Sequence, residues 1–186
     1  MFMELAFSEQ MHFLLEAIKD IQGTIRAVDT KVSILLAALA IPLPQVALFF
    51  SYWHARGFSA TPGHVLMVLA IVLYIAAVYI AVKTLVGIGD ATGHIRGVRM
   101  QNTFYAGGMF RLDWRDSLAD RLSVKSSKTV DEYVASLPST RGGMAEELAI
   151  EMMALAYIRD LKLYRQRSAF AATVTAGAIA FIALIA

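Results

Sequence analysis

The stretch AVDTKVSILLAALA, residues 27–40, places an acid and a base immediately before an apolar run. Opposite charges at the mouth of a membrane segment can form an interfacial cap, the polar end that any such helix needs. Alternatively, they can pair with charges on another helix and hold one packing arrangement. In that case we expect Asp29 to pair with Lys162 or Arg165 of a C-terminal helix, and Lys31 to find a partner in the same bundle.

Residue groupings that would support catalysis or metal binding are weak. The chain has no cysteine, which excludes disulfides, thiolate metal sites and cysteine nucleophiles. Its four histidines stand on separate segments and form no H-E-x-x-H motif. The carboxylates Asp113, Asp116 and Asp120 alternate with arginines, which is typical of a solvated face of salt bridges. We therefore expect no catalytic residue, no metal and no cofactor, and hence no enzyme.

The composition favours a membrane protein. The 186 residues are 58% hydrophobic and 17% charged, with a mean hydropathy of +0.57, whereas soluble domains carry about 25% charged residues. The net charge of +2 is too small to indicate nucleic-acid binding. We predict an all-α integral membrane protein with three transmembrane helices and long cytoplasmic helical stalks.

The three spans come from the lengths of the apolar runs, because about 17–25 residues cross a bilayer. We place them at residues 32–53, 64–88 and 168–186, with a cytoplasmic N-terminal helix over 1–31 that continues into the first span and a cytoplasmic helical region over 89–167. The first span contains Pro42 and Pro44, which remove backbone donors and predict a hinge there. Small residues recur every four positions in the third span at Ala172, Ala176 and Ala180, a spacing that permits close helix contact, although alanine is common in any membrane helix.

The orientation follows from basic residues near the span ends. The link between the first two spans holds one, Arg56, whereas the other ends carry Arg26, Lys31, Lys83, Arg96, Arg99, Arg159, Lys162, Arg165 and Arg167. The protein is thus expected in the inner membrane of the cell, with a cytoplasmic N-terminus and the C-terminus outside.

Two amphipathic stretches predict the stalks. Apolar residues recur in steps of three and four at Met11, Leu14, Ile18, Ile21, Ile25, Val28, Val32, Leu35 and Leu39, a heptad seam that needs a partner helix. A second helix is expected to begin after Gly142 and Gly143 and to continue into the third span. We expect the two to pack together, within one chain or between protomers. The motif TVDE, residues 129–132, predicts a capping box at the start of a short helix.

Three stretches carry a resemblance to a known family. IRAVDTKVSILLAAL (25–39) is similar to its opening motif, and NTFYAGGM (102–109) is a looser match to an aromatic, glycine-containing segment. VDEYVASL (130–137) and ELAIEMMALAYIRDLKLYRQRSAF (147–170) are similar to its closing region, with Lys162 at the place of its usual lysine. The chain resembles the transmembrane effectors of the Pycsar antiphage systems over nearly its whole length.

The resemblance implies a function. In these systems a partner cyclase makes cyclic CMP or cyclic UMP during infection, and the effector responds by impairing the inner membrane, which causes abortive infection. The expected partners are membrane lipids, the cyclic nucleotide and further copies of the chain in a homo-oligomer. A singly charged nucleotide needs basic donors and aromatic surface. The ligand-binding candidates are Arg96, Arg99, Tyr105, Arg111 and Arg115, although Arg96 and Arg99 would equally suit lipid headgroups.

Rival classes remain at this stage. One is a non-enzymatic membrane scaffold without a nucleotide ligand, which would show no toxicity with any nucleotide. Another is a small channel or transporter subunit, which the lack of ionisable groups deep within the spans disfavours. A membrane-bound enzyme is the third alternative class and the least favoured.

Overall fold

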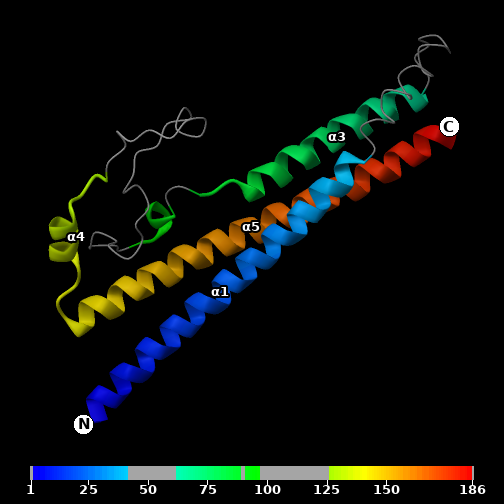
Figure 1. Cartoon of the computed structure of the whole chain (residues 1–186). Coiled ribbons are helices and arrows are strands. Elements are labelled where there is room, and N and C mark those ends of the chain that lie inside the picture. The colour runs from blue at the N-terminus through cyan, green and yellow to red at the C-terminus, as the bar shows by residue number, and fades with distance from the viewer. Residues whose placement is uncertain (1, 42–61, 89–90, 97–125, 186) are drawn as a thin grey trace. The chain divides into compact units, whose positions relative to one another are not determined.

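The computed structural model describes residues 2–41, 62–88, 91–96 and 126–185. Within these ranges the protein is all-helical, with α1 (Phe2–Ala40), α3 (Pro62–Leu85), the 3-10 helix η1 (Thr92–His94), α4 (Val130–Ser136) and α5 (Arg141–Ile185) (Figure 1). The expectation of an all-α protein is confirmed for this part of the chain.

Helix α1 runs through 39 residues without a break. Its heptad seam explains this, because all nine seam residues are buried or half-buried, among them Ile18, Val28 and Val32. Gly23 lies in the middle of the helix, and nothing lies within 4 Å of the place where a Cβ would stand. A glycine at this place costs about 1 kcal/mol relative to alanine, yet α1 continues through it. The expected continuous helix is present.

Side-chain caps set the starts of α4 and α5. Thr129 and Glu132 form the predicted capping box: the backbone N–H of Glu132 donates to the Thr129 hydroxyl, and the Glu132 carboxylate accepts from the Thr129 N–H. Helix α5 begins at Arg141 rather than after Gly143, which corrects the expected start. The hydroxyl of Thr140 accepts from the backbone N–H of Gly143 at 3.1 Å and so satisfies a donor that the first turn leaves open.

The chain divides into two compact units that are joined by the continuous helices α1 and α5. The first comprises residues 1–22 and 88–158, and the second residues 23–87 and 159–186. In the first unit α1 and α5 run in the same direction, because the Arg141 guanidinium lies over the Phe7 ring at 5.8 Å and residues 9–14 face residues 145–149. The two stalk segments thus pack together within one chain.

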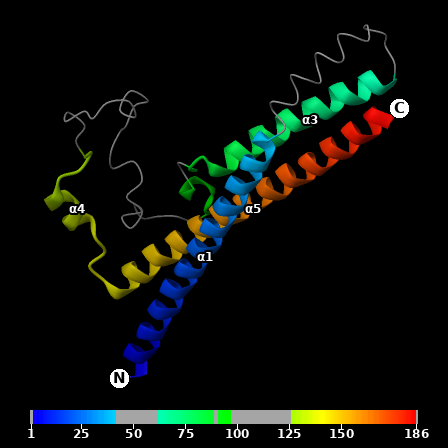
Figure 2. The ribbon, with the colours of Figure 1, turned by 45° about the vertical axis from the view of Figure 1, so that its right-hand side comes forward.

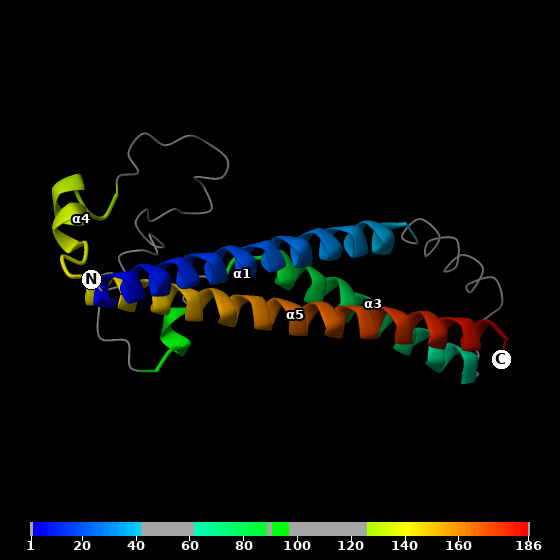
Figure 3. The same ribbon diagram turned by 90° about the horizontal axis from the view of Figure 1, so that it is seen from below.

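The second unit is a bundle of three helix segments. Val28 and Val32 of α1, Ala81 of α3 and Ala169 of α5 form its buried core. Figure 2 shows α3 lying along α5 in the opposite direction, and Figure 3 shows α1 following the direction of α5. At one end of α3 the carbonyl of Lys83 accepts a hydrogen bond from Arg165.

Alanine and glycine line the contact between α3 and α5. The carbonyl oxygen of Ala183 lies 3.3 Å from where a Cβ on Gly63 would stand. Within the part of α5 that belongs to the second unit, the buried alanines are Ala169 and Ala176, seven residues apart, whereas Ala172 and Ala180 are only half-buried. Close packing therefore follows the seven-residue repeat rather than the expected four-residue repeat, because seven residues return to the same face after two turns.

One helix among the described residues is long and apolar enough to cross a membrane. This is Gly63–Leu85, with a mean hydropathy of 2.9 and 22% of its most apolar window buried. The expected first span extends to residue 53 and therefore lies partly outside the described residues. Helix α5 reaches Ile185 through the expected third span, but three membrane spans are not established by these helices.

Candidate functional site

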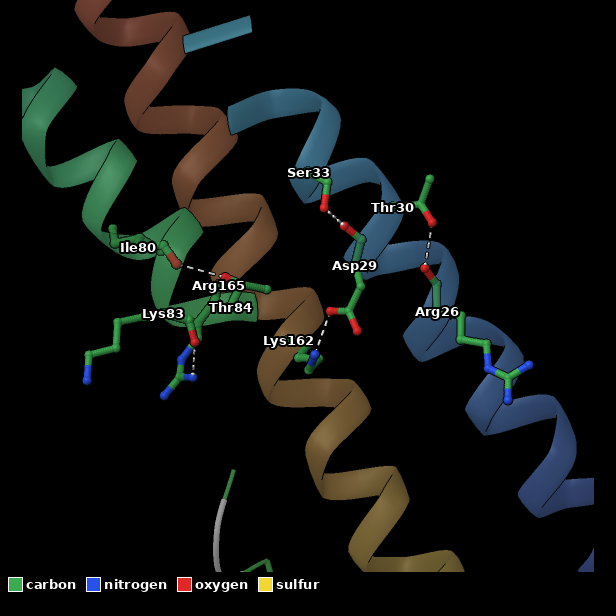
Figure 4. A network of polar contacts seen from close by, with 9 residues as sticks. All are labelled: Arg26, Asp29, Thr30, Ser33, Ile80, Lys83, Thr84, Lys162 and Arg165. Atoms are coloured by element: carbon green, nitrogen blue, oxygen red, sulfur yellow. Dashed lines mark hydrogen bonds and ion pairs between the residues drawn. The ribbon is translucent and has the colours of Figure 1, made fainter. Parts of the chain in front are cut away.

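An ion pair between α1 and α5 is the centre of the candidate site. The ammonium nitrogen of Lys162 donates to Oδ1 of Asp29 at 2.5 Å, and the two residues are 133 positions apart in the sequence (Figure 4). The lysine side chain is 7% exposed and the aspartate side chain 37% exposed. The ammonium group of Lys162 is therefore shielded from solvent, whereas the carboxylate of Asp29 remains partly accessible to it.

The buried core of the second unit explains why this pair forms where it does. Val28 and Val32 flank Asp29 in the sequence and are 3% and 0% exposed. Leu163 packs against the same core directly after Lys162. Asp29 therefore lies at the edge of the interface that the valines bury, where it can reach the lysine of the neighbouring helix. A buried ammonium group needs such a partner, because burying an unpaired charge is costly.

A second polar contact joins α5 to α3 at nearly the same level. Arg165 donates through Nη1 to the backbone carbonyl of Lys83 at 2.9 Å. Lys83 lies in the last turn of α3, where the carbonyl groups find no N–H donor within the helix. Next to it, the fully buried Thr84 donates its hydroxyl to the carbonyl of Ile80 at 2.8 Å. Lys162 and Arg165 thus tie α5 to α1 and to α3 respectively.

Two buried carboxylates occupy the first unit. Glu147 and Glu151 are 3% and 5% exposed and stand one helical turn apart on α5. Oε2 of Glu151 has no hydrogen-bond partner among the described residues. Burial, and secondarily the nearby Glu147, raise the pKa of the Glu151 carboxyl above its ordinary value. The carboxyl therefore favours its neutral form more than an exposed glutamate would.

An aromatic pair lies in the same unit. The rings of His94 and Tyr157 stack with their centroids 4.4 Å apart and their planes 20° from parallel. This contact fixes η1 against α5. Arg96 follows two residues later and is exposed, so it is the one ligand-binding candidate whose position the structure describes.

A groove of about 710 Å³ opens between α1 and α5 in the first unit, lined by Glu9, Gln10, Phe13, Leu14, Ala145, Glu146 and Ala149. Its two charged residues are acidic, and none of the residues that line it in the described part of the chain is basic. A phosphate needs positively charged or N–H donors, so this groove does not suit a cyclic nucleotide.

Comparison with known proteins gives one match. Residues 13–186 match the model of the Pycsar effector protein domain. The chain belongs to the Pycsar effector family. No curated protein and no solved structure matches it. The family assignment makes the protein an antiphage defence effector, and together with the apolar helix α3 it indicates association with a membrane.

The structure of this Pycsar effector brings some of the expected site residues into contact and leaves others apart. Asp29 pairs with Lys162, one of its two expected partners, whereas Arg165 binds the Lys83 carbonyl instead. Lys31 is exposed and has no ion-pair partner among the described residues. The remaining candidates lie outside those residues, namely Arg99, Tyr105, Arg111 and Arg115 for ligand binding and Pro42 and Pro44 for the hinge.

Sequence reasoning missed the buried glutamates of the Pycsar effector. It assigned Glu147 and Glu151 no role at a site. Their spacing carries a signal, because Glu147, Glu151, Ala154 and Ile158 repeat at four, three and four residues and so form one stripe. All four are buried. Among the described residues no group of three or more potential ligands forms a metal site.

Proposed function

We propose that this effector is a non-enzymatic, multi-pass protein of the bacterial inner membrane that a cyclic pyrimidine nucleotide, cyclic CMP or cyclic UMP, activates to impair that membrane. The observation that carries the proposal is the family match over residues 13–186. The partner pyrimidine cyclase would supply the nucleotide, and loss of membrane integrity would end the infection before phage mature.

The second unit supports a three-span arrangement. Its segments of α1 and α5 run in one direction and α3 in the other, as three consecutive membrane crossings require (Figure 1). Large apolar side chains remain exposed on each segment, including Ile34 (65%), Val72 (56%), Ile75 (60%) and Phe170 (61%). Such an apolar surface is unusual in water and suits lipid. The N-terminus would then be cytoplasmic and the C-terminus outside.

The pair of Asp29 and Lys162 supports a gating role. Its charges hold α1 against α5 in the arrangement described above, which we assign to the resting state. Activation requires that the nucleotide bind a second arrangement more tightly, because a ligand shifts an equilibrium only through differential affinity. Repacking of the spans in a homo-oligomer, with the Pro42–Pro44 segment as the hinge, would open the membrane.

Dye release from liposomes tests this function. The purified protein is reconstituted with its N-terminus accessible, and cyclic CMP, cyclic UMP, cyclic AMP or buffer is added. We expect leakage with one pyrimidine nucleotide and none with cyclic AMP. If a folded, correctly oriented protein gives no dye leakage with any of the four additions, the result would favour a scaffold without a ligand. Leakage that is equal with and without nucleotide would favour a constitutive channel subunit.

A further inference from the structure

The charged side chains of the second unit lie at one level. Asp29 on α1 meets Lys162 on α5 at 2.5 Å, and Arg165 meets the Lys83 carbonyl of α3 at 2.9 Å, so the three helices are in register there (Figure 4). In the described part of this unit, Asp, Glu, Lys and Arg occur only within residues 26–31, at 83 and within 159–167. All three helices thus change from charged to uncharged at the same height.

The uncharged length beyond this level matches a bilayer. Gly63 lies against the Ala183 carbonyl at the far end of the contact between α3 and α5, and Lys83 lies against Arg165 at the near end. About 20 residues of α3 separate the two points, which at 1.5 Å per residue is about 30 Å. The hydrocarbon core of a bilayer is also about 30 Å thick. The charged level therefore falls where one layer of lipid headgroups would lie.

Positive charge is in excess at this level. The described part of the unit holds seven basic and two acidic side chains, and both acids are occupied, Asp29 by Lys162 and Asp160 by Arg159 at 2.9 Å. Arg165 is engaged by a carbonyl group. The other four cations are exposed and have no acidic partner among the described residues: Arg26, Lys31, Lys83 and Arg167.

These four cations face outward and adjoin apolar surface. Figure 4 shows the side chains of Arg26 and Lys83 projecting away from the ion pair. The ammonium group of Lys83 lies 5.9 Å from the ring of Tyr79, an amphipathic neighbour of the kind found at membrane interfaces. Val82 (46% exposed) adjoins Lys83 in the sequence, and Phe170 (61% exposed) lies three residues after Arg167, close to the same helix face. A ligand that contacts both the four cations and the neighbouring apolar side chains carries a negative group and acyl chains.

We propose that Arg26, Lys31, Lys83 and Arg167, here called the cationic collar, bind the phosphate groups of anionic phospholipids in the cytoplasmic leaflet. This inference rests on the membrane-spanning placement proposed above but not on activation by a nucleotide. Each basic residue near an anionic membrane surface contributes about fivefold in affinity. A soluble cyclic nucleotide shares the phosphate chemistry but has no acyl chains to cover the exposed apolar side chains.

Native mass spectrometry of the full chain in detergent micelles tests the collar. The protein is titrated with phosphatidylglycerol and, separately, with phosphatidylcholine. The test variant is Lys31→Gln/Arg167→Gln, and the control Lys19→Gln/Lys128→Gln removes two cations from the first unit. We expect the wild type and the control to prefer phosphatidylglycerol, and the collar variant to lose at least about tenfold of this preference.

Three outcomes would overturn the proposal. The first is equal binding of both lipids by the wild type, and the second is a preference that the collar variant retains. The third is displacement of phosphatidylglycerol by millimolar cyclic CMP or cyclic UMP, which would assign the collar to a soluble nucleotide. Carbonate extraction of membranes shows separately whether the variants remain integrated, and the dye-release assay reports activation. Failure of the proposed function is therefore distinguishable from failure of the collar.

Discussion

Lys162 of α5 is nearly buried, and its ammonium group is paired with the carboxylate of Asp29 on α1, the more exposed member of the pair. The two side chains are thus unequal in what they lose when the pair is broken. Removal of the aspartate leaves a charge buried without its partner. Removal of the lysine leaves a carboxylate that water can reach.

We expect this inequality to appear in mutants. Asp29→Asn should lower the free energy of unfolding by about 2 kcal/mol, below the roughly 3–5 kcal/mol of fully buried pairs because solvent screens the aspartate. Lys162→Met fills a similar volume with apolar atoms and should cost less than about 1 kcal/mol. Thermal melting in detergent measures both. Equal losses in the two variants would contradict the assignment of Lys162 as the buried member.

Charge exchange tests whether the same pair controls activity. Asp29→Lys places two cations together and should cause dye leakage without any nucleotide, because it weakens the resting arrangement. The double variant Asp29→Lys/Lys162→Glu restores opposite charges and should return leakage to its nucleotide-dependent level. Ala27→Lys, which also adds a cation at an exposed position two residues away, is the matched control and should leak no more than the wild type. If the exchange gives no rescue, the pair is not the gate.

Glu151 should make stability depend on pH. Its folded pKa is raised above the ordinary value of 4.5, so the folded state binds more protons than the unfolded state. Stability is therefore highest below about pH 4.5, falls as pH rises through the raised pKa, and stays at the lower value above it. Glu151→Gln should remove this decline and raise Tm at pH 7. The exposed Glu146→Gln is the control, and an identical pH profile for both variants would refute the role of burial.

Tyr74 of α3 provides a hydrogen-bond donor for the C-terminal end of α1. Its hydroxyl donates to the backbone carbonyl of Leu39, which lies in the last turn of α1, where carbonyls lack a partner within the helix. Tyr74→Phe should cost about 1 kcal/mol, the net value of a hydrogen bond in a protein. Tyr79→Phe is the matched control, since Tyr79 is 61% exposed on the same helix. Unfolding in a denaturing detergent titration distinguishes the two.

Gly63 should tolerate no larger side chain. A Cβ there would already stand 3.3 Å from the Ala183 carbonyl, whereas nothing lies within 4 Å of a Cβ at Gly177. Gly63→Val should push α3 from α5 and destabilise the bundle by about 1–3 kcal/mol, the usual range for overpacking. Gly177→Val should be neutral within about 0.5 kcal/mol. A comparison of their melting temperatures tests the contact.

The helices themselves were predictable because their signals are local. The step of three and four from Met11 to Leu39 predicts one long helix with one buried stripe, and α1 has both. The capping box at Thr129 and Glu132 needs only residues three positions apart. The expected start of α5 was wrong by three residues, because the glycines at 142 and 143 suggested a break, whereas Thr140 caps a helix that includes them.

The candidate site was predictable only in part. The sequence shows a lysine and an arginine, Lys162 and Arg165, three residues apart and therefore on neighbouring positions of one helix face. Either could reach Asp29 in principle. The choice of Lys162 depends on how α5 rotates when Ala169 packs into the core with Val32, and that rotation directs Arg165 to α3.

By itself the sequence determined the helical class, the buried stripe of α1, the absence of cysteine chemistry and the membership of a family of antiphage effectors, since these follow from composition, periodicity and short motifs. Only the tertiary structure decided which charges meet, that Glu147 and Glu151 are buried, and that the charges of three helices end at one level. These features depend on contacts between residues as far apart as Asp29 and Lys162, and such contacts are set by packing, which no local pattern encodes.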